Sequence, residues 1–118
     1  ADAQLRTLSA FGLVSDAPVV RQGDRHALYE AALARLLDAG LAFACHCSRT
    51  DLAETGGIHR ACRPDRHRDT PAIRLRVPDD ARIGFEDAIQ GRFEQDVARE
   101  VGDVVLRRAD GYWAYQLA

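Results

Sequence analysis

Residues 41–63 read LAFACHCSRTDLAETGGIHRACR and hold all three cysteines of the chain. Cys45 and Cys47 close an apolar run, and Cys62 returns after a helix-sized interval, with His59 three residues before it. Structural zinc takes four tetrahedral ligands and prefers thiolate and imidazole, so such a stretch can form one metal loop. A closed zinc site also orders a segment that is too small to bury a core of its own.

The identity of the fourth ligand is open at this stage. His59 is the first choice because it follows the Gly56-Gly57 turn, which can bring it back to the Cys-x-Cys pair. His46 and His67 are the rival imidazoles. Three cysteines cannot pair completely as disulfides, which argues against a secreted disulfide scaffold. Spacing alone leaves zinc and packed free thiols as equal alternatives.

Length and charge bound the function. The 118 residues fit one domain, or one domain with a small appendage, and 47% hydrophobic content is enough for a core. The formal net charge of −2 excludes a globally basic nucleic-acid binder but leaves room for a local basic face. No apolar run approaches the roughly 18 residues of a membrane span, and no signal peptide is visible. We expect a cytoplasmic protein without membrane contact.

The ends of the sequence suggest an incomplete chain. It contains no methionine, opens at Ala1 and closes at Ala118 just as a new apolar segment begins. We therefore expect an internal fragment of a longer protein.

The first 44 residues predict two helices and a strand. A helix is expected over 2–12, with Asp2 as its N-cap and Gly12 as its stop. A second helix, capped by Asp24 and closed by Gly40, is the most regular pattern in the chain. Its apolar stripe is formed by Leu28, Ala31, Ala32 and Leu36. A short buried strand, 41–44, then enters the metal loop.

The remainder is richer in strands. A small helix is expected over 49–54 with Ser48 as its cap. From residue 71 the apolar period becomes two, which predicts a strand over 72–77 with one face covered. Asp110-Gly111 is a turn signal before Trp113. Further extended segments are expected at 81–86, 91–95 and 103–107.

A charged connector follows the last cysteine, reading RPDRHRD from Arg63 to Asp69. Its simplest interpretation is a solvated loop, and the alternative is a patch that touches phosphate. If the chain were a free-standing zinc-dependent module for RNA or protein binding, its contacts would be made by Arg60, Arg63, Arg66 and Arg68.

The C-terminal run DVVLRRADGYWAYQLA, residues 103–118, resembles the segment of glutamyl-type class I tRNA synthetases that carries a glutamate-binding tyrosine. Upstream pieces agree with the same family in order and spacing: Gln22 to Tyr29, Gly40 to Ser48, and Pro71 to Arg76. The resemblance covers essentially the whole chain. The compact GGIH turn before Cys62-Arg63 and the RRADGYWAYQLA ending are most similar to the short paralogues of the family.

The resemblance implies an α/β fold, part of a Rossmann-type catalytic domain with an inserted small zinc-binding subdomain. It divides the chain into a helical part of the catalytic domain (1–44), a zinc insertion (45–70) and a strand-rich connective segment (71–118). The short paralogues activate L-glutamate with ATP and transfer it to queuosine in the anticodon loop of tRNA(Asp). We expect the same of the parent protein, as a monomer. An ordinary glutamyl-tRNA synthetase is the alternative enzyme.

Site residues carry over one by one. Cys45, Cys47 and Cys62 match the three zinc cysteines of the family, and His59 stands where the family often has tyrosine. Tyr115 matches the tyrosine of the glutamate pocket, and a core tyrosine is the alternative. The family's ATP motifs do not occur here, so no catalytic residue is assigned and the isolated chain is expected to form no glutamyl-adenylate.

Overall fold

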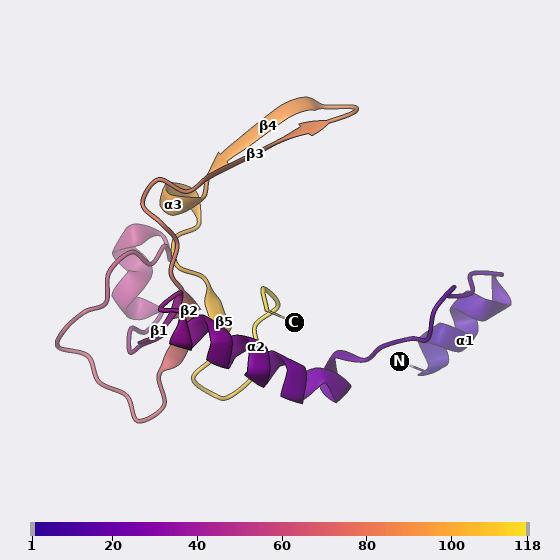
Figure 1. Cartoon of the computed structure of the whole chain (residues 1–118), viewed down its shortest axis with the longest axis horizontal. Coiled ribbons are helices and arrows are strands. Elements are labelled where there is room, and N and C mark those ends of the chain that lie inside the picture. The colour runs from indigo at the N-terminus through magenta and orange to yellow at the C-terminus, as the bar shows by residue number, and fades with distance from the viewer. Residues whose placement is uncertain (1, 118) are drawn as a thin grey trace.

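Two helices open the computed structural model, which describes residues 2–117 (Figure 1). Helix α1 (Asp2–Ala10) starts at the expected residue and ends two residues early, as the chain turns into the positive φ of Gly12. Helix α2 (His26–Asp38) follows a 3-10 turn, η1 (Gln22–Arg25). The prediction that Asp24 caps α2 is wrong, because Asp24 lies within η1 and the N-cap, Arg25, makes no side-chain capping bond.

A three-stranded antiparallel sheet packs against α2. Its strands are β1 (Ala42–Cys45), β2 (Ala72–Leu75) and β5 (Val105–Arg107), in the order β1-β2-β5. The buried core between helix and sheet is formed by Leu33, Ala42, Ile73 and Leu106, with Leu36, Leu75, Trp113 and Leu117 at its margin. In residues 2–117 all pairings between named strands are antiparallel, so this segment by itself does not form the parallel sheet of a Rossmann-type domain.

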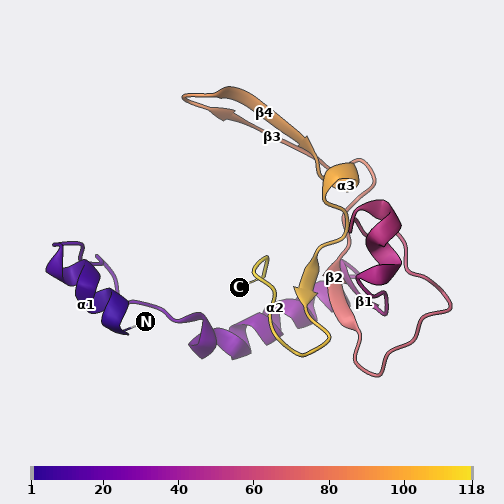
Figure 2. The ribbon, with the colours of Figure 1, turned by 180° about the vertical axis from the view of Figure 1, so that it is seen from behind.

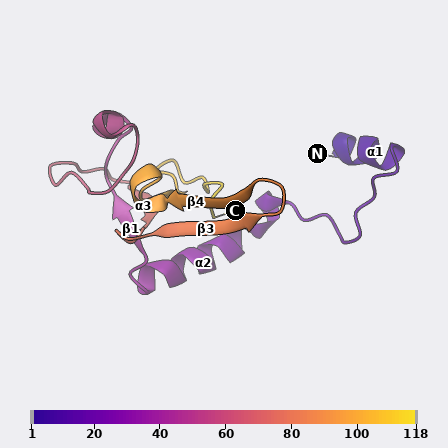
Figure 3. The same ribbon diagram turned by 90° about the horizontal axis from the view of Figure 1, so that it is seen from above.

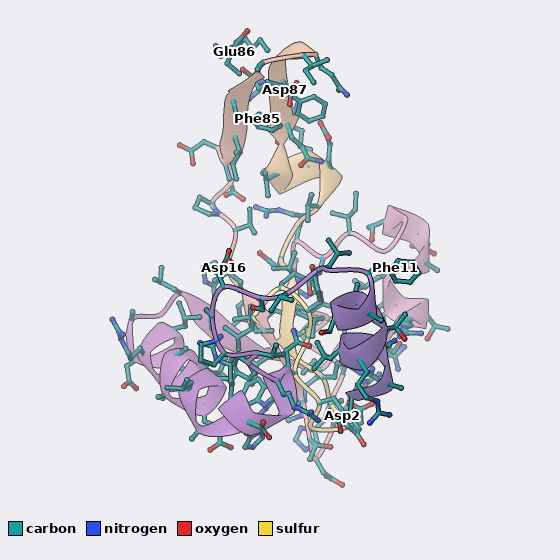
Figure 4. All side chains as sticks on the ribbon, turned by 90° about the vertical axis from the view of Figure 1, so that its right-hand side faces the viewer. Asp2, Phe11, Asp16, Phe85, Glu86 and Asp87 are labelled. Atoms are coloured by element: carbon teal, nitrogen blue, oxygen red, sulfur yellow. The ribbon has the colours of Figure 1, made fainter. Side chains whose placement is uncertain are left out.

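A second sheet is a hairpin that projects from the first (Figures 1 and 2). It consists of β3 (Arg82–Asp87) and β4 (Gly91–Asp96), close to the expected extended segments, and is followed by α3 (Val97–Glu100). The four-residue α3 is too short to give a helical period, so the sequence did not predict it. Figure 4 shows Phe85, Glu86 and Asp87 on this projecting arm.

The chain is extended and leaves apolar surface open. Its radius of gyration is 18.3 Å, whereas a compact domain of this length has about 13 Å. Helix α1 lies apart from the sheet (Figure 3) and buries none of its residues. Phe11 at its end is 79% exposed. Within residues 2–117 we find no helix with the length and apolar content that crossing a membrane requires.

Candidate metal centre

The structure brings Cys45, Cys47, His59 and Cys62 together. Cys45 ends β1 and is fully buried, Cys47 follows it in the loop, and His59 returns to them with only 1% of its surface exposed. Their potential ligand atoms all lie within 4.8 Å of one another. Both rival imidazoles lie outside this group.

The spacing fits a tetrahedral ion. His59 Nε2 lies 3.3 Å from Cys45 Sγ and 3.6 Å from Cys62 Sγ. A tetrahedral zinc with Zn–S of about 2.3 Å and Zn–N of about 2.0 Å places sulfur and nitrogen roughly 3.5 Å apart. Three sulfurs and one imidazole are also a donor set typical of closed structural zinc sites. The arrangement therefore has the size and the chemistry of a zinc centre.

A buried carboxylate orients His59. Asp103 Oδ2 lies 2.9 Å from His59 Nδ1, which leaves Nε2 facing the thiols. The other oxygen, Oδ1, accepts the backbone N–H of Val77 at 2.9 Å, so both carboxylate oxygens have partners. Metal-binding histidines commonly donate their second ring N–H to such a carboxylate, which fixes the ring and strengthens the ligand. Asp103 is a supporting residue that the sequence did not predict, because 44 residues separate it from His59.

The backbone next to Asp103 approaches the site closely. Gly102 has φ +70° and pairs with His59 in an isolated parallel bridge. The Asp103 N–H donates to the His59 carbonyl at 2.8 Å. A Cβ atom on Gly102 would lie 2.5 Å from that carbonyl oxygen and 2.7 Å from Ile58 Cγ2. Only glycine satisfies both the positive φ and this contact.

The thiols are arranged for a cation. Cys47 Sγ accepts the backbone N–H of Arg63 at 3.3 Å. Desolvation of its sulfur, together with the neighbouring Cys45 and Cys47 thiols, raises the pKa of Cys62 to about 11. Three thiolates this close would repel one another. A bound divalent ion stabilises them, so its binding releases protons from the thiols.

The two rival histidines have other partners. The rings of His46 and His67 stack on each other, 5.2 Å apart at 22°. His46 Nδ1 accepts the backbone N–H of Arg68 at 3.0 Å. Both therefore shape the charged loop, outside the group of four.

The corner after Cys47 is held by reciprocal bonds. Ser48 Oγ accepts the N–H of Asp51 at 3.1 Å, while Asp51 Oδ2 accepts from the Ser48 N–H at 2.7 Å and from its hydroxyl at 2.6 Å. Ser48 was expected to cap a helix over 49–54, but the helix observed, η2 (Thr50–Thr55), is 3-10 and its N-cap is Arg49, so Ser48 lies one residue before the cap. These bonds from Ser48, followed by the Arg66 guanidinium, lower the pKa of Asp51 to about 2.

Ser48→Ala is expected to raise the pKa of Asp51 from about 2 toward its ordinary 3.8, because the hydroxyl donor is the largest cause of the shift. A carboxyl with a lowered folded-state pKa adds stability above its unfolded pKa, and this is lost as pH falls through the folded value. The contribution is thus present above about pH 4 and fades toward pH 2. Carbon-detected NMR titration of the carboxyl measures it. Ser15→Ala, a distant exposed site, is the control, and an unchanged Asp51 titration in Ser48→Ala would contradict the assignment.

Tyr115, the residue predicted to bind the substrate glutamate, lies on the segment after β5 and is 86% exposed. The aromatic that enters the core is instead Trp113, which packs edge-on against Tyr29 at 5.8 Å. Its Nε1–H donates to His26 Nδ1 at 2.7 Å. In this structure Tyr115 is therefore not a core tyrosine, and its phenol is open to a ligand.

Comparison with known proteins gives the family. The family profile described as tRNA synthetases class I (E and Q), catalytic domain, matches residues 1–118. The chain belongs to this family. A relative named Glutamyl-Q tRNA(Asp) synthetase from Xanthomonas axonopodis pv. citri is 64% identical over 98% of the chain and 38% of the relative. One of the same name from Neisseria meningitidis serogroup C is 49% identical over 97% of the chain and 42% of the relative. The resemblance inferred from the sequence is confirmed.

A solved glutamate tRNA ligase has the same fold in this region. The crystal structure of a glutamate tRNA ligase from Elizabethkingia meningosepticum, in complex with its amino acid, matches with a TM-score of 0.74 at 19% identity. The match covers 98% of this chain and 30% of the ligase. The chain likewise spans 38–42% of the curated synthetases it resembles.

Proposed function

We propose that this chain is the zinc-bearing segment of an ATP-dependent enzyme that activates L-glutamate and transfers it to queuosine in the anticodon loop of tRNA(Asp). The observation that carries the proposal is the 64% identity, over 98% of the chain, to a synthetase named for glutamyl-Q and tRNA(Asp). The match of the whole chain to a synthetase profile favours an enzyme over a free-standing binding module.

In this proposal Cys45, Cys47, His59 and Cys62 hold one structural zinc. Four protein ligands leave no open position for water or substrate, so the ion acts through rigidity and not as a Lewis acid. It ties the end of β1 to the loop that returns at residue 59, and Asp103 joins that loop to the approach to β5. The insertion, 45–70, thereby keeps a fixed position between the helical part (1–44) and the connective segment (71–118).

Tyr115 is proposed as the glutamate-binding residue. Its exposed hydroxyl can hydrogen-bond a small polar substrate, and its rigid ring does so at little conformational cost. In the parent reaction the glutamate carboxylate attacks the α-phosphorus of ATP and releases pyrophosphate. A hydroxyl of the modified base then attacks the acyl carbon of the mixed anhydride and releases AMP. Both steps depend on positioning and charge stabilisation.

The test is a chimera in which this chain replaces the matching 38% of the Xanthomonas axonopodis relative. We expect ATP-dependent transfer of radiolabelled glutamate to queuosine-containing tRNA(Asp), and none to tRNA(Asp) that lacks queuosine. Transfer instead to the 3′ end of tRNA(Glu) would make the segment that of an ordinary glutamyl-tRNA synthetase. A folded chimera without transfer, beside an active relative, would overturn the proposal. The isolated chain should form no glutamyl-adenylate.

Within the chimera, Tyr115→Phe should raise the KM for glutamate about 10-fold or more. One hydrogen bond to a charged group contributes about 1.5–3 kcal/mol. Tyr112→Phe is the matched control, because Tyr112 is also exposed, at 70%, and lies three residues away. Steady-state ATP–pyrophosphate exchange measures the KM for glutamate of both variants. Equal effects of the two substitutions would remove Tyr115 from the glutamate site.

A further inference from the structure

A cavity of about 450 Å³ lies beside the metal centre and is rich in arginine. It is bounded by the corner after β1, by β2, by β5 and by the turn that follows β5. Its charged walls are supplied by Arg49, Arg68, Arg74, Arg108 and Asp110. Segments far apart in the sequence therefore bring four guanidinium groups and one carboxylate to the same space, a formal excess of positive charge.

Three of the four arginines between residues 60 and 68 already form ion pairs. Arg60 pairs with Asp79, Arg63 lies 3.6 Å from Asp65, and Arg66 lies 2.9 Å from Asp51. Arg68 differs, because within residues 2–117 its guanidinium forms no ion pair, and it lines the cavity. Arg49 likewise lines the cavity without an ion pair to the described residues. Arg108 is paired with Asp110. The available charge is thus that of Arg49, Arg68 and Arg74.

Arg74 offers a donor without an acceptor. Its Nη1 donates to the Asp103 carbonyl at 2.7 Å, which anchors the side chain. Its Nε is buried and has no hydrogen-bond partner among residues 2–117. A guanidinium keeps its charge at all physiological pH values, and a buried N–H without an acceptor is unfavourable. Arg74 also lines the cavity, and the described residues give its Nε no acceptor.

We propose that this cavity binds a phosphate group. Guanidinium groups bind phosphate oxygens through paired, charge-assisted hydrogen bonds, and two of them line the cavity here, Arg68 in the loop before β2 and Arg74 on β2. The inference rests on the proposed function for its two sources of phosphate: the backbone of an RNA substrate and the pyrophosphate released from ATP. The competing explanation is that the arginines only balance a zinc centre with three thiolates, which carries a net negative charge.

The experiment titrates the zinc-loaded chain with inorganic phosphate, with pyrophosphate and with a short single-stranded RNA, while NMR follows the Arg74 Nε–H resonance. Arg68→Gln should weaken binding of each phosphate probe that the wild type binds, about 3- to 10-fold, and should reduce the dependence of log K on log salt for RNA by about 0.7. Arg6→Gln, an exposed arginine on α1, is the matched control and should change neither. Arg49→Gln removes a second cavity-lining arginine without an ion pair and should weaken phosphate binding in the same direction.

Saturable binding of RNA with little response to pyrophosphate assigns the site to the nucleic-acid backbone, and the reverse assigns it to a free phosphate. The proposal is overturned if no probe shifts the Arg74 resonance, if Arg6→Gln weakens binding as much as Arg68→Gln, or if Arg68→Gln lowers zinc retention and leaves phosphate binding unchanged. Failure of the glutamate-transfer assay with phosphate binding intact would reject the proposed function alone.

Discussion

Replacing Cys45 by serine is expected to reduce bound zinc from about one ion per chain to nearly none. Cys45 is fully buried at the end of β1, 3.3 Å from the imidazole nitrogen of His59, so no water can take its place without moving the strand. Serine is a weak zinc ligand and leaves a buried hydroxyl. Elemental mass spectrometry of the purified chain, under reducing and chelator-free conditions, measures the metal directly.

His46 and His67 provide matched controls for His59. His59→Ala should weaken zinc binding, whereas His46→Ala and His67→Ala should retain it, because those two rings stack on each other outside the site. Retention in His59→Ala together with loss in His46→Ala would place the fourth ligand elsewhere. A wild-type chain without zinc would leave the three thiols as packing residues, and the family assignment would then stand on the sequence match alone.

Most of this centre could be predicted because it is local. The ligands fall between Cys45 and Cys62, and the return of the chain depends on Gly56 and Gly57, both at positive φ, +64° and +89°. Such a turn is visible in the sequence as a glycine pair. The strands and α2 could be predicted for the same reason, since periods of two and 3.6 are properties of short windows.

What the sequence did not predict depends on distant residues. Asp103 lies on no local pattern, yet it fixes the imidazole that completes the site. The partners of Trp113 and the cavity with Arg68 and Arg74 also join segments that only the folded chain brings together. Asp24 is a local prediction that failed. Its side chain is of a type that caps helices, but it lies in the 3-10 turn that precedes α2.

The second large effect on zinc affinity is expected for Gly102→Ala. This substitution tests how the segment before β5 positions the candidate ligand His59. Alanine at φ +70° is strained by about 1–2 kcal/mol, and its Cβ would meet the His59 carbonyl oxygen at 2.5 Å. The contacting atom is backbone, so the clash is relieved only by moving His59 or the Gly102–Asp103 segment. Either movement disturbs the 2.9 Å contact between Asp103 and the imidazole.

We therefore expect Gly102→Ala to lower zinc affinity by at least about 2 kcal/mol, or roughly 30-fold, in competition with a chelator of known affinity. Gly111→Ala separates strain from clash, because Gly111 also has a positive φ, +87°, but a Cβ atom added to it would meet nothing within 4 Å. It should lose stability locally and keep its zinc. Equal zinc affinities in the two variants would mean that the Gly102 contact does not position His59. A selective loss in Gly102→Ala would show that the approach to β5 holds the ligand in place.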